Sequence, residues 1–215
     1  METHPKLNHS DEEKMFDDVI AKDIGAFHER GLNTPDWSKS SPPRFADGIW
    51  KFIELNHRFN NLLWDEEDLA RRRNVPDSEI AANKRAIDGY NQKRNDAIEN
   101  IDDLLLQRLA RIEPEATAWL NSETAGSIID RLSIISLKIF HMRLQTQRDD
   151  VEQAHIEACR QKLGKLVEQR ADLQHCLDTL LAAAACGRAQ FKIYRQFKMY
   201  NDPALNPYLY RDREK

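Results

Sequence analysis

The chain has 215 residues, of which 40% are hydrophobic and 32% are charged, so it is long enough to form one substantial core. Its formal net charge of −4 argues against bulk binding to nucleic acid or to an anionic membrane, because a weakly acidic protein attracts neither. The sequence contains seven glycines and eight prolines, a composition that favours helix over strand. The expected fold class is therefore all-α.

The three cysteines are odd in number and lack C-x-x-C spacing, which is typical of reduced thiols rather than of a disulfide framework. The first residues show no basic region followed by an apolar run, and no window approaches 18 uninterrupted apolar residues. We therefore expect a soluble cytoplasmic protein with no membrane insertion.

The N-terminal part of the chain predicts one helix. Ser10 and Glu13 form a capping box that opens this helix, and Gly31 ends it. Residues 32–44 are rich in proline and serine, so we expect a linker that lets the helix pack separately. Residues 1–44 should accordingly comprise a tail, a helix and a linker.

Two long helices are predicted next, from about Phe45 to Arg72 and from about Ser78 to Ile112. The turn between them is short, so the helices should form an antiparallel hairpin. Each helix carries an apolar stripe that becomes polar partway along. A buried amide or charge costs a few kcal/mol unless it has a partner, so the interruption indicates either a satisfied network or a site.

The antiparallel register of this hairpin brings the two polar interruptions together. Counting back along one helix and forward along the other places Asn60 opposite Asn91 and His57 opposite Asn95. The sequence therefore predicts a polar centre between the two helices.

Asn121 and Ser122 offer caps for a further helix, and a last long helix is expected over roughly residues 150–185. Beyond Gly187 basic and aromatic residues alternate, and this segment is predicted to clamp onto the bundle. We expect residues 45–215 to form one helical bundle domain that includes this clamp segment. The whole fold should be an antiparallel bundle of about five long helices with an N-terminal helix and an irregular aromatic C-terminal tail.

Four groups of motifs, in chain order, carry a resemblance to a known family. They are His57-x-x-Asn60 with Leu63-Trp64-x-x-Glu67-Asp68-x-Ala70-Arg71; Lys84-Arg85-x-Ile87-Asp88-x-x-Asn91-Gln92-x-Arg94-Asn95-Asp96; Asp130-Arg131-Leu132-Ser133 with Lys138-Ile139-x-His141-Met142; and Phe191-Lys192-x-Tyr194-Arg195-Gln196-x-Lys198-Met199-Tyr200-Asn201-Asp202-Pro203. Over residues 45–210 the chain resembles the bacterial family catalogued as domain of unknown function 4254. The resemblance implies no established activity, only an association with gene clusters for cell-envelope glycans. The chain departs from the family pattern at Asp65, where relatives often carry histidine.

The polar stripes supply candidate site residues. Histidine can transfer protons near neutral pH, so His57 and His141, together with Asp88, are the catalytic candidates. Guanidinium and ammonium groups bind phosphate or carboxylate directly. The ligand-binding candidates are Asn60, Trp64, Glu67, Asp68, Arg71, Lys84, Arg85, Asn91, Arg94, Asn95, Asp130, Arg131, Lys138, Arg195 and Lys198. The opposing interpretation is that these cations pair with the neighbouring carboxylates in a purely structural network.

Metal binding is weakly indicated. His155 and Cys159 are four residues apart on one helix face, but two ligands do not make a zinc site, so no metal ligands are assigned and no cofactor is identified. Glu67 and Glu99 superficially match the magnesium-binding helices of all-α nucleoside triphosphate pyrophosphohydrolases. The hairpin separates these two acids by about 20 Å at 1.5 Å per residue, too far for one magnesium cluster.

Three functional hypotheses follow from the sequence. The first is a bundle whose polar interior site binds or acts on a phosphorylated or nucleotide-linked sugar metabolite, in cell-envelope glycan metabolism; it predicts a pocket that opens at the polar centre. The second is a protein-interaction or scaffold module, with a protein partner or a second copy of the chain, whose polar network is sealed and whose exposed apolar patch lies on the Ser10 to Gly31 helix. A magnesium-dependent pyrophosphohydrolase-like enzyme is a minor alternative. Four tail cations on an acidic protein make nucleic acid an unlikely partner.

Overall fold

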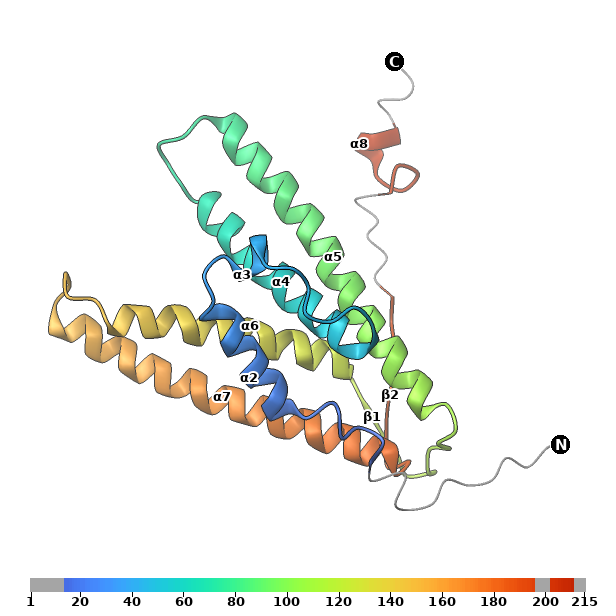
Figure 1. Ribbon diagram of the computed structural model, residues 1–215. Helices are drawn as coiled ribbons and strands as arrows, with labels where there is room; N and C mark the ends of the chain where they lie inside the picture. Colours follow the sequence, from blue (N-terminus) through green and yellow to red (C-terminus); the bar gives the residue numbers. More distant parts are fainter. Residues whose placement is uncertain (1–13, 196–201, 211–215) are drawn as a thin grey trace.

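The structure of the chain is a computed structural model that describes residues 14–195 and 202–210 (Figure 1). These residues form helices and two strands of three residues each, which confirms the predicted all-α class. The helices are α2 (Ala21–Leu32), α3 (Trp37–Ser40), α4 (Gly48–Leu69), α5 (Asp77–Leu109), α6 (Ala125–Thr146), α7 (Gln153–Ala185) and α8 (Pro207–Tyr210), and the strands are β1 (Trp119–Asn121) and β2 (Ala189–Phe191). None of the described helices is long and apolar enough to span a membrane.

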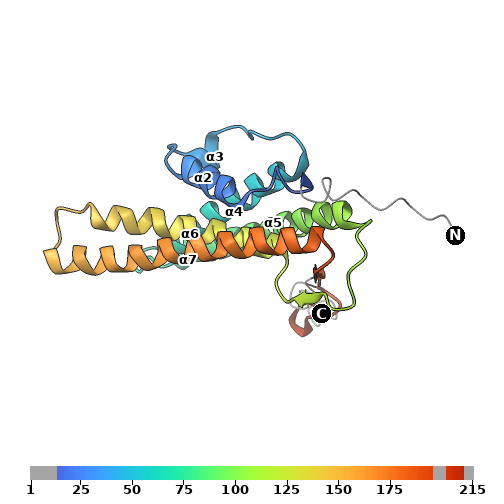
Figure 2. The same ribbon diagram turned by 90° about the horizontal axis from the view of Figure 1, so that it is seen from below.

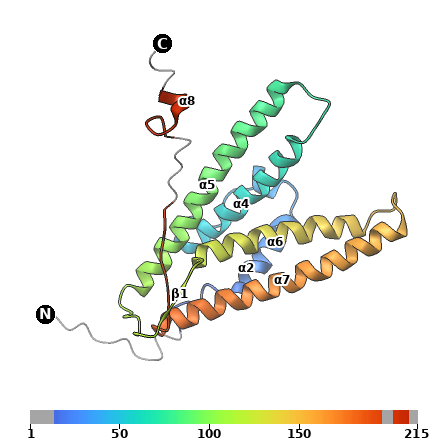
Figure 3. The same cartoon turned by 180° about the vertical axis from the view of Figure 1, so that it is seen from behind.

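The four long helices form two antiparallel hairpins. α4 packs along α5, α6 packs along α7, and the two pairs meet where α6 contacts both α4 and α5. Figures 1 and 3 show that the two hairpins lie close together at one end and diverge toward their tips. Figure 2 shows that the hairpins form a layer and that α2 and α3 lie on one side of it.

The hydrophobic core lies at the shared base of the hairpins. α2 joins this core by packing against α6 and α7. The core includes Ile24 and Phe27 of α2, Ile53 of α4, Leu132 of α6 and Leu177 of α7. The N-terminal helix thus buries its apolar face in the same core as the hairpins, while the division of the chain into residues 1–44 and 45–215 stays a prediction.

The predicted N-terminal helix is interrupted in the described structure, because residues 15–20 are not helical and α2 begins at Ala21. Val19 and Ala21 are buried, Ile20 has extended backbone torsions, and the backbone N–H of Ala21 donates to Asp178 on α7 at 3.0 Å. This anchoring breaks the helix that the apolar spacing predicts and restarts it as α2 at Ala21. Ser10 and Glu13, the predicted capping box, lie outside the described residues.

Gly31 does not end the helix as predicted, because α2 continues to Leu32. Gly31 instead allows the Trp37 ring to approach the backbone of α2 closely. A Cβ added at Gly31 would lie 3.0 Å from Cε2 of that ring. The glycine therefore lets the α3 segment pack directly on α2.

A buried ion pair fastens the connection between α2 and α4. Arg58 Nη2 lies 2.8 Å from Glu54 Oε1, and both side chains are almost completely shielded from solvent. Glu54 also accepts hydrogen bonds from the backbone N–H groups of Arg44 and Phe45, while Arg58 donates to the carbonyl oxygen of Trp37 at 2.9 Å. The proline-rich segment is thus a fixed part of the structure. The expectation of a linker that lets the first helix pack separately was wrong.

The N-terminus of α6 is capped by Thr124, whose side chain accepts a hydrogen bond from the backbone N–H of Ser127. The predicted cap at Asn121 is wrong, because Asn121 belongs to β1, which pairs in parallel with β2. The carboxylate of Asp102 on α5 accepts from the backbone N–H of Gly126 at 2.6 Å. Burial raises the pKa of Asp102 to about 6, although hydrogen bonding of its carboxylate with the Thr124 side chain and the Gly126 backbone acts in the opposite direction.

After β2 the chain runs against α5. Arg195 forms ion pairs with Glu99 and Asp103, and the distance from its Nη2 to Asp103 Oδ2 is 3.0 Å. The described part of the aromatic-basic segment therefore contacts the bundle through a cation that already has two acidic partners. Lys198, the other cation predicted to serve a ligand, lies outside the described residues.

Candidate functional site

The polar residues at the base of α4 form a buried network rather than an open site. Asp130 on α6 accepts hydrogen bonds at 2.8 Å from the side-chain amides of both Asn56 and Asn60. Asn60 also donates to Ser133 Oγ at 3.0 Å, and Ser133 Oγ lies 2.8 Å from His57 Nδ1. Each polar group here has a partner, as burial requires.

His57 lies at the end of this network against α2. Its Nε2 is 3.1 Å from the backbone carbonyl oxygen of His28, so Nε2 donates and Nδ1 accepts from the Ser133 hydroxyl. The rings of His57 and His28 stack with their centroids 4.2 Å apart. Burial lowers the pKa of His57 to about 3, so the imidazole is neutral near pH 7.

The predicted partnership of His57 with Asn95 was wrong. Both ring nitrogens of His57 are used by α6 and α2, because the face of α4 that carries His57 packs toward these helices and not toward α5. Full burial also removes His57 from contact with any substrate in this structure. By contrast, Asn60 and Asn91 do border one common pocket, which agrees with the predicted juxtaposition of α4 and α5 at this level.

The solvent-accessible candidate site lies farther along the same helices, where the hairpins diverge. Trp64 of α4 and His141 of α6 stack with ring centroids 4.4 Å apart and an angle of 5° between their planes. Burial lowers the pKa of His141, and the nearby carboxylates of Asp68 and Asp65 oppose this shift. A neutral imidazole can accept a proton or a hydrogen bond, so His141 stays an acid–base candidate.

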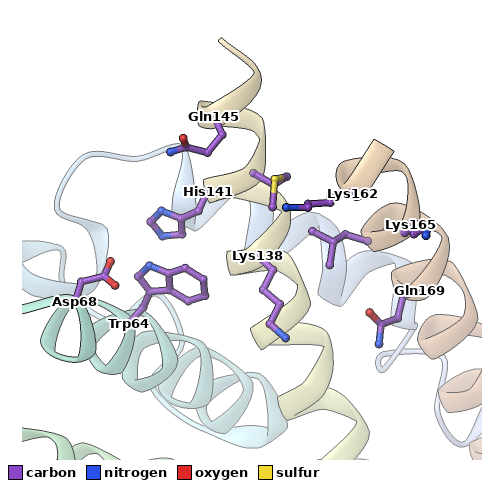
Figure 4. Close-up of a pocket in the computed structure, with 10 residues that line it drawn as sticks. Trp64, Asp68, Lys138, His141, Gln145, Lys162, Lys165 and Gln169 are labelled. Atoms are coloured by element: carbon purple, nitrogen blue, oxygen red, sulfur yellow. The ribbon is translucent and has the colours of Figure 1, made fainter. Parts of the chain in front are cut away.

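A pocket of about 540 Å³ begins at this stacked pair and extends to α7. Figure 4 shows Trp64, Asp68 and His141 on one side of the pocket and Lys162, Lys165 and Gln169 of α7 on the other. Met142 and Leu166 contribute apolar surface. The pocket thus combines an aromatic and hydrogen-bond-accepting wall with a cationic wall.

The lysines of this pocket differ from most cations around them. Within the described residues, Lys138, Lys162 and Lys165 form no ion pair, although all three line the pocket. Neighbouring cations are neutralised: Lys39 lies 2.7 Å from Asp65, and Arg170 lies 2.6 Å from Glu29. Three ammonium groups around one pocket, without acidic partners in this part of the chain, favour an anionic ligand.

A second pocket of about 330 Å³ adjoins the first and shares Trp64 and Asp68 with it. Its other polar lining residues are the predicted ligand-binding residues Asn60, Glu67, Arg71, Asn91 and Arg94. Glu67 and Arg71 form an ion pair with one another at 3.0 Å. These predicted residues of α4 and α5 therefore do come together. They line the second pocket, beside α5, and not the first pocket, beside α7.

The remaining candidates lie away from these two pockets. Asp88 pairs with Lys84 on the exposed face of α5, Arg85 is exposed on the same helix, and Arg131 pairs with Glu123 at 2.6 Å. Asn95 is buried and accepts from Arg94 Nη2 at 3.2 Å. Asp88, Lys84, Arg85 and Arg131 are thus not lining residues of either pocket, and their predicted roles gain no geometric support.

The sequence did not predict the α7 lysines that line the pocket or the buried Glu54–Arg58 ion pair of α4. Lys162 and Lys165 are three residues apart on α7 and so share a helix face, a spacing that offered a signal. Glu54 and Arg58 are four residues apart with opposite charge, which usually indicates an exposed pair. His28 gave no signal, because nothing in its local sequence marks it as the stacking partner of His57.

Metal ligands do not converge in the described part of the chain. No group of three histidine, cysteine, aspartate or glutamate side chains there is arranged to hold a metal ion. The predicted pair on α7 does form a contact, since Cys159 Sγ lies 3.4 Å from His155 Nε2. The acids of the pyrophosphohydrolase alternative are divided, because Glu67 pairs with Arg71 and Glu99 pairs with Arg195.

Comparison with known proteins places the chain in a family. No curated protein and no solved structure matches the chain. A family model, described as protein of unknown function (DUF4254), matches residues 50–193, which is more than half of the chain and includes every residue that lines the two pockets beside Trp64. The chain therefore belongs to the DUF4254 family of proteins of unknown function.

Proposed function

We propose that this protein binds a phosphorylated metabolite in the pocket between its two hairpins. The observation that carries the proposal is the set of three lysines, 138, 162 and 165, which surround the pocket and form no ion pair within the described residues. Phosphate groups are bound well by ammonium groups that lie beside an apolar, partly enclosed surface. Nucleotide-linked sugars are members of this ligand class, and they would fit the association with cell-envelope glycan gene clusters that the family resemblance implies.

His141 would contact the organic part of such a ligand. It stacks on Trp64 and lies across the pocket from the α7 lysines (Figure 4). In its neutral form it can accept a hydrogen bond from a ligand hydroxyl, and it is the one catalytic candidate among the three that lines this pocket. We further propose a cytoplasmic location, because Cys159, Cys176 and Cys186 are all free thiols.

A thermal-shift screen of phosphorylated metabolites tests this proposal, because a ligand that binds the folded state raises the melting temperature. The variants are Lys162→Gln and Lys165→Gln, and the matched control is Lys22→Gln, which removes the same charge from an exposed position on α2. We expect stabilisation of the wild type and the control by at least one phosphorylated compound, and a smaller shift in both pocket variants. Equal shifts in all four proteins, or no shift with any compound, would refute the proposal.

A second candidate function is protein interaction, because two adjacent large apolar side chains of β1 are exposed. Trp119 and Leu120 are 46% and 51% exposed. Within the described part of the predicted N-terminal helix, Ile24 and Phe27 are buried in the core, whereas Ile20 is exposed. Light scattering of the wild type and of Trp119→Ser/Leu120→Ser tests self-association through this strand. A concentration-dependent increase in mass that the substitutions abolish would support it, and a monomer at all concentrations would exclude it.

A further inference from the structure

The pocket beside α7 and the pocket beside α5 adjoin one another, because Trp64 and Asp68 line both. The first pocket is lined by residues of α4, α6 and α7, and the second by residues of α4, α5 and α6. The first pocket measures about 540 Å³ and the second about 330 Å³. A small anion held at the lysines would occupy only the first pocket.

The far end of the second pocket offers hydrogen bonds rather than free positive charge. Asn91 lines it and makes no side-chain hydrogen bond to another described residue, so its amide donor and acceptor are both available. Arg71, by contrast, is already paired with Glu67. Arg94 contributes a buried Nε that has no hydrogen-bond partner among the described residues and lies 4.0 Å from Asp130 Oδ1. A neutral polar group therefore suits this end better than a second phosphate.

The two ends of the cleft thus differ in chemistry. Lys162 and Lys165 present ammonium groups on α7, Trp64 provides apolar surface to both pockets, and Asn91 presents an amide on α5. We infer that the ligand is an elongated phosphorylated metabolite. Its terminal phosphate lies against the α7 lysines, its middle passes Trp64, and its far end bears hydrogen-bonding groups that contact Asn91. This inference rests on the proposed function and specifies its ligand class.

Titration calorimetry with three probes tests the length of the ligand. The probes are inorganic phosphate, glycerol 3-phosphate and uridine 5′-monophosphate, which share a phosphate and differ in the size and hydrogen-bonding capacity of the attached group. The variants are Lys162→Gln at one end and Asn91→Leu at the other, with Asn91→Ala as a smaller change at the same position. Asn100→Leu, an exposed asparagine of α5 outside both pockets, is the matched control. Melting curves of all variants verify folding.

We expect uridine 5′-monophosphate to bind at least tenfold more tightly than glycerol 3-phosphate, which in turn binds more tightly than inorganic phosphate. Lys162→Gln should weaken all three probes. Asn91→Leu and Asn91→Ala should weaken only uridine 5′-monophosphate, by about tenfold for a lost hydrogen bond to the ligand, and Asn100→Leu should change nothing.

The outcomes separate this inference from the proposed function. If Lys162→Gln weakens the probes while the Asn91 variants affect all three equally or none, the elongated ligand is refuted and the phosphate-binding pocket stands. If no probe binds, or if Lys162→Gln has no effect on any of them, both proposals fail.

Discussion

His28 and His57 stack inside the core with their ring centroids 4.2 Å apart, and each is completely buried. The two histidines join α2 to α4, and the hydroxyl of Ser133 on α6 donates a hydrogen bond to Nδ1 of His57. Burial lowers the pKa of both rings below the ordinary value of 6.5, and for His28 the neighbouring His57 adds to the effect of burial. The pair is therefore stable only in its neutral form.

The first prediction concerns acid stability. Unfolding exposes both histidines, so below pH 6.5 the unfolded state binds more protons than the folded state, and the free energy of unfolding falls as pH is lowered toward 3. A histidine that is protonated only in the unfolded state contributes about 1.4 kcal/mol per pH unit to this fall. Because His28 makes no hydrogen bond through its ring nitrogens in the described structure, His28→Phe should keep the packing and remove about half of this contribution.

Urea unfolding measured from pH 7 to pH 4 checks this slope. The control is His155→Gln on α7, which replaces an exposed histidine and should leave the slope as in the wild type. An unchanged slope in His28→Phe would show that the stacked pair does not govern acid unfolding.

The second prediction concerns the ion pair between Glu54 and Arg58. Glu54→Gln leaves the guanidinium of Arg58 buried without its carboxylate, which should destabilise the protein by about 3–5 kcal/mol. The matched control is Glu67→Gln, which removes an exposed pair with Arg71 at the same four-residue spacing and should cost less than about 1 kcal/mol. Chemical denaturation of both variants measures the difference. Equal losses would mean that the pair does not anchor the segment before α4.

The third prediction compares two glycines in long helices. A Cβ at Gly126 would lie 2.7 Å from the carbonyl oxygen of Ile98, whereas a Cβ at Gly89 would meet nothing within 4 Å. Gly126→Ala should therefore force α6 away from α5 and destabilise the protein by about 1–3 kcal/mol. Gly89→Ala should stabilise it by about 1 kcal/mol, because alanine favours an exposed helix interior. Thermal melts of the two variants test the opposite signs; a gain for Gly126→Ala would contradict the close contact.

The helices could be predicted from the sequence because their apolar spacing is regular over many turns. The expected hairpin over residues 45–112 appears as α4 and α5, and the expected final helix appears as α7, each with ends shifted by a few residues. The prediction of the first helix failed over the residues just before α2. Val19 and Ala21 are held there by tertiary contacts that interrupt the helix, and local periodicity does not encode such contacts.

The site was predicted only in part, because it depends on how the two hairpins diverge. Asn60 and Asn91 border a common pocket, as the antiparallel register requires. The stacking of Trp64 on His141 joins helices that are far apart in the sequence, and the α7 lysines reach the pocket only because the second hairpin folds back beside α6. The register of one helix pair determines neither the Trp64–His141 stack nor the position of the α7 lysines, because both depend on how the two hairpins pack against each other.

The most direct test of the central claim is calorimetric titration of uridine 5′-monophosphate into the wild type, into the triple variant Lys138→Gln/Lys162→Gln/Lys165→Gln and into the control Lys22→Gln. Loss of these three ammonium groups, which form no ion pair within the described residues, should weaken binding by at least a hundredfold, because a hydrogen bond to a charged group contributes about 1.5–3 kcal/mol. We expect this loss in the triple variant alone, with wild-type affinity in the control. Equal affinity in all three proteins, or no binding to the wild type, would contradict it.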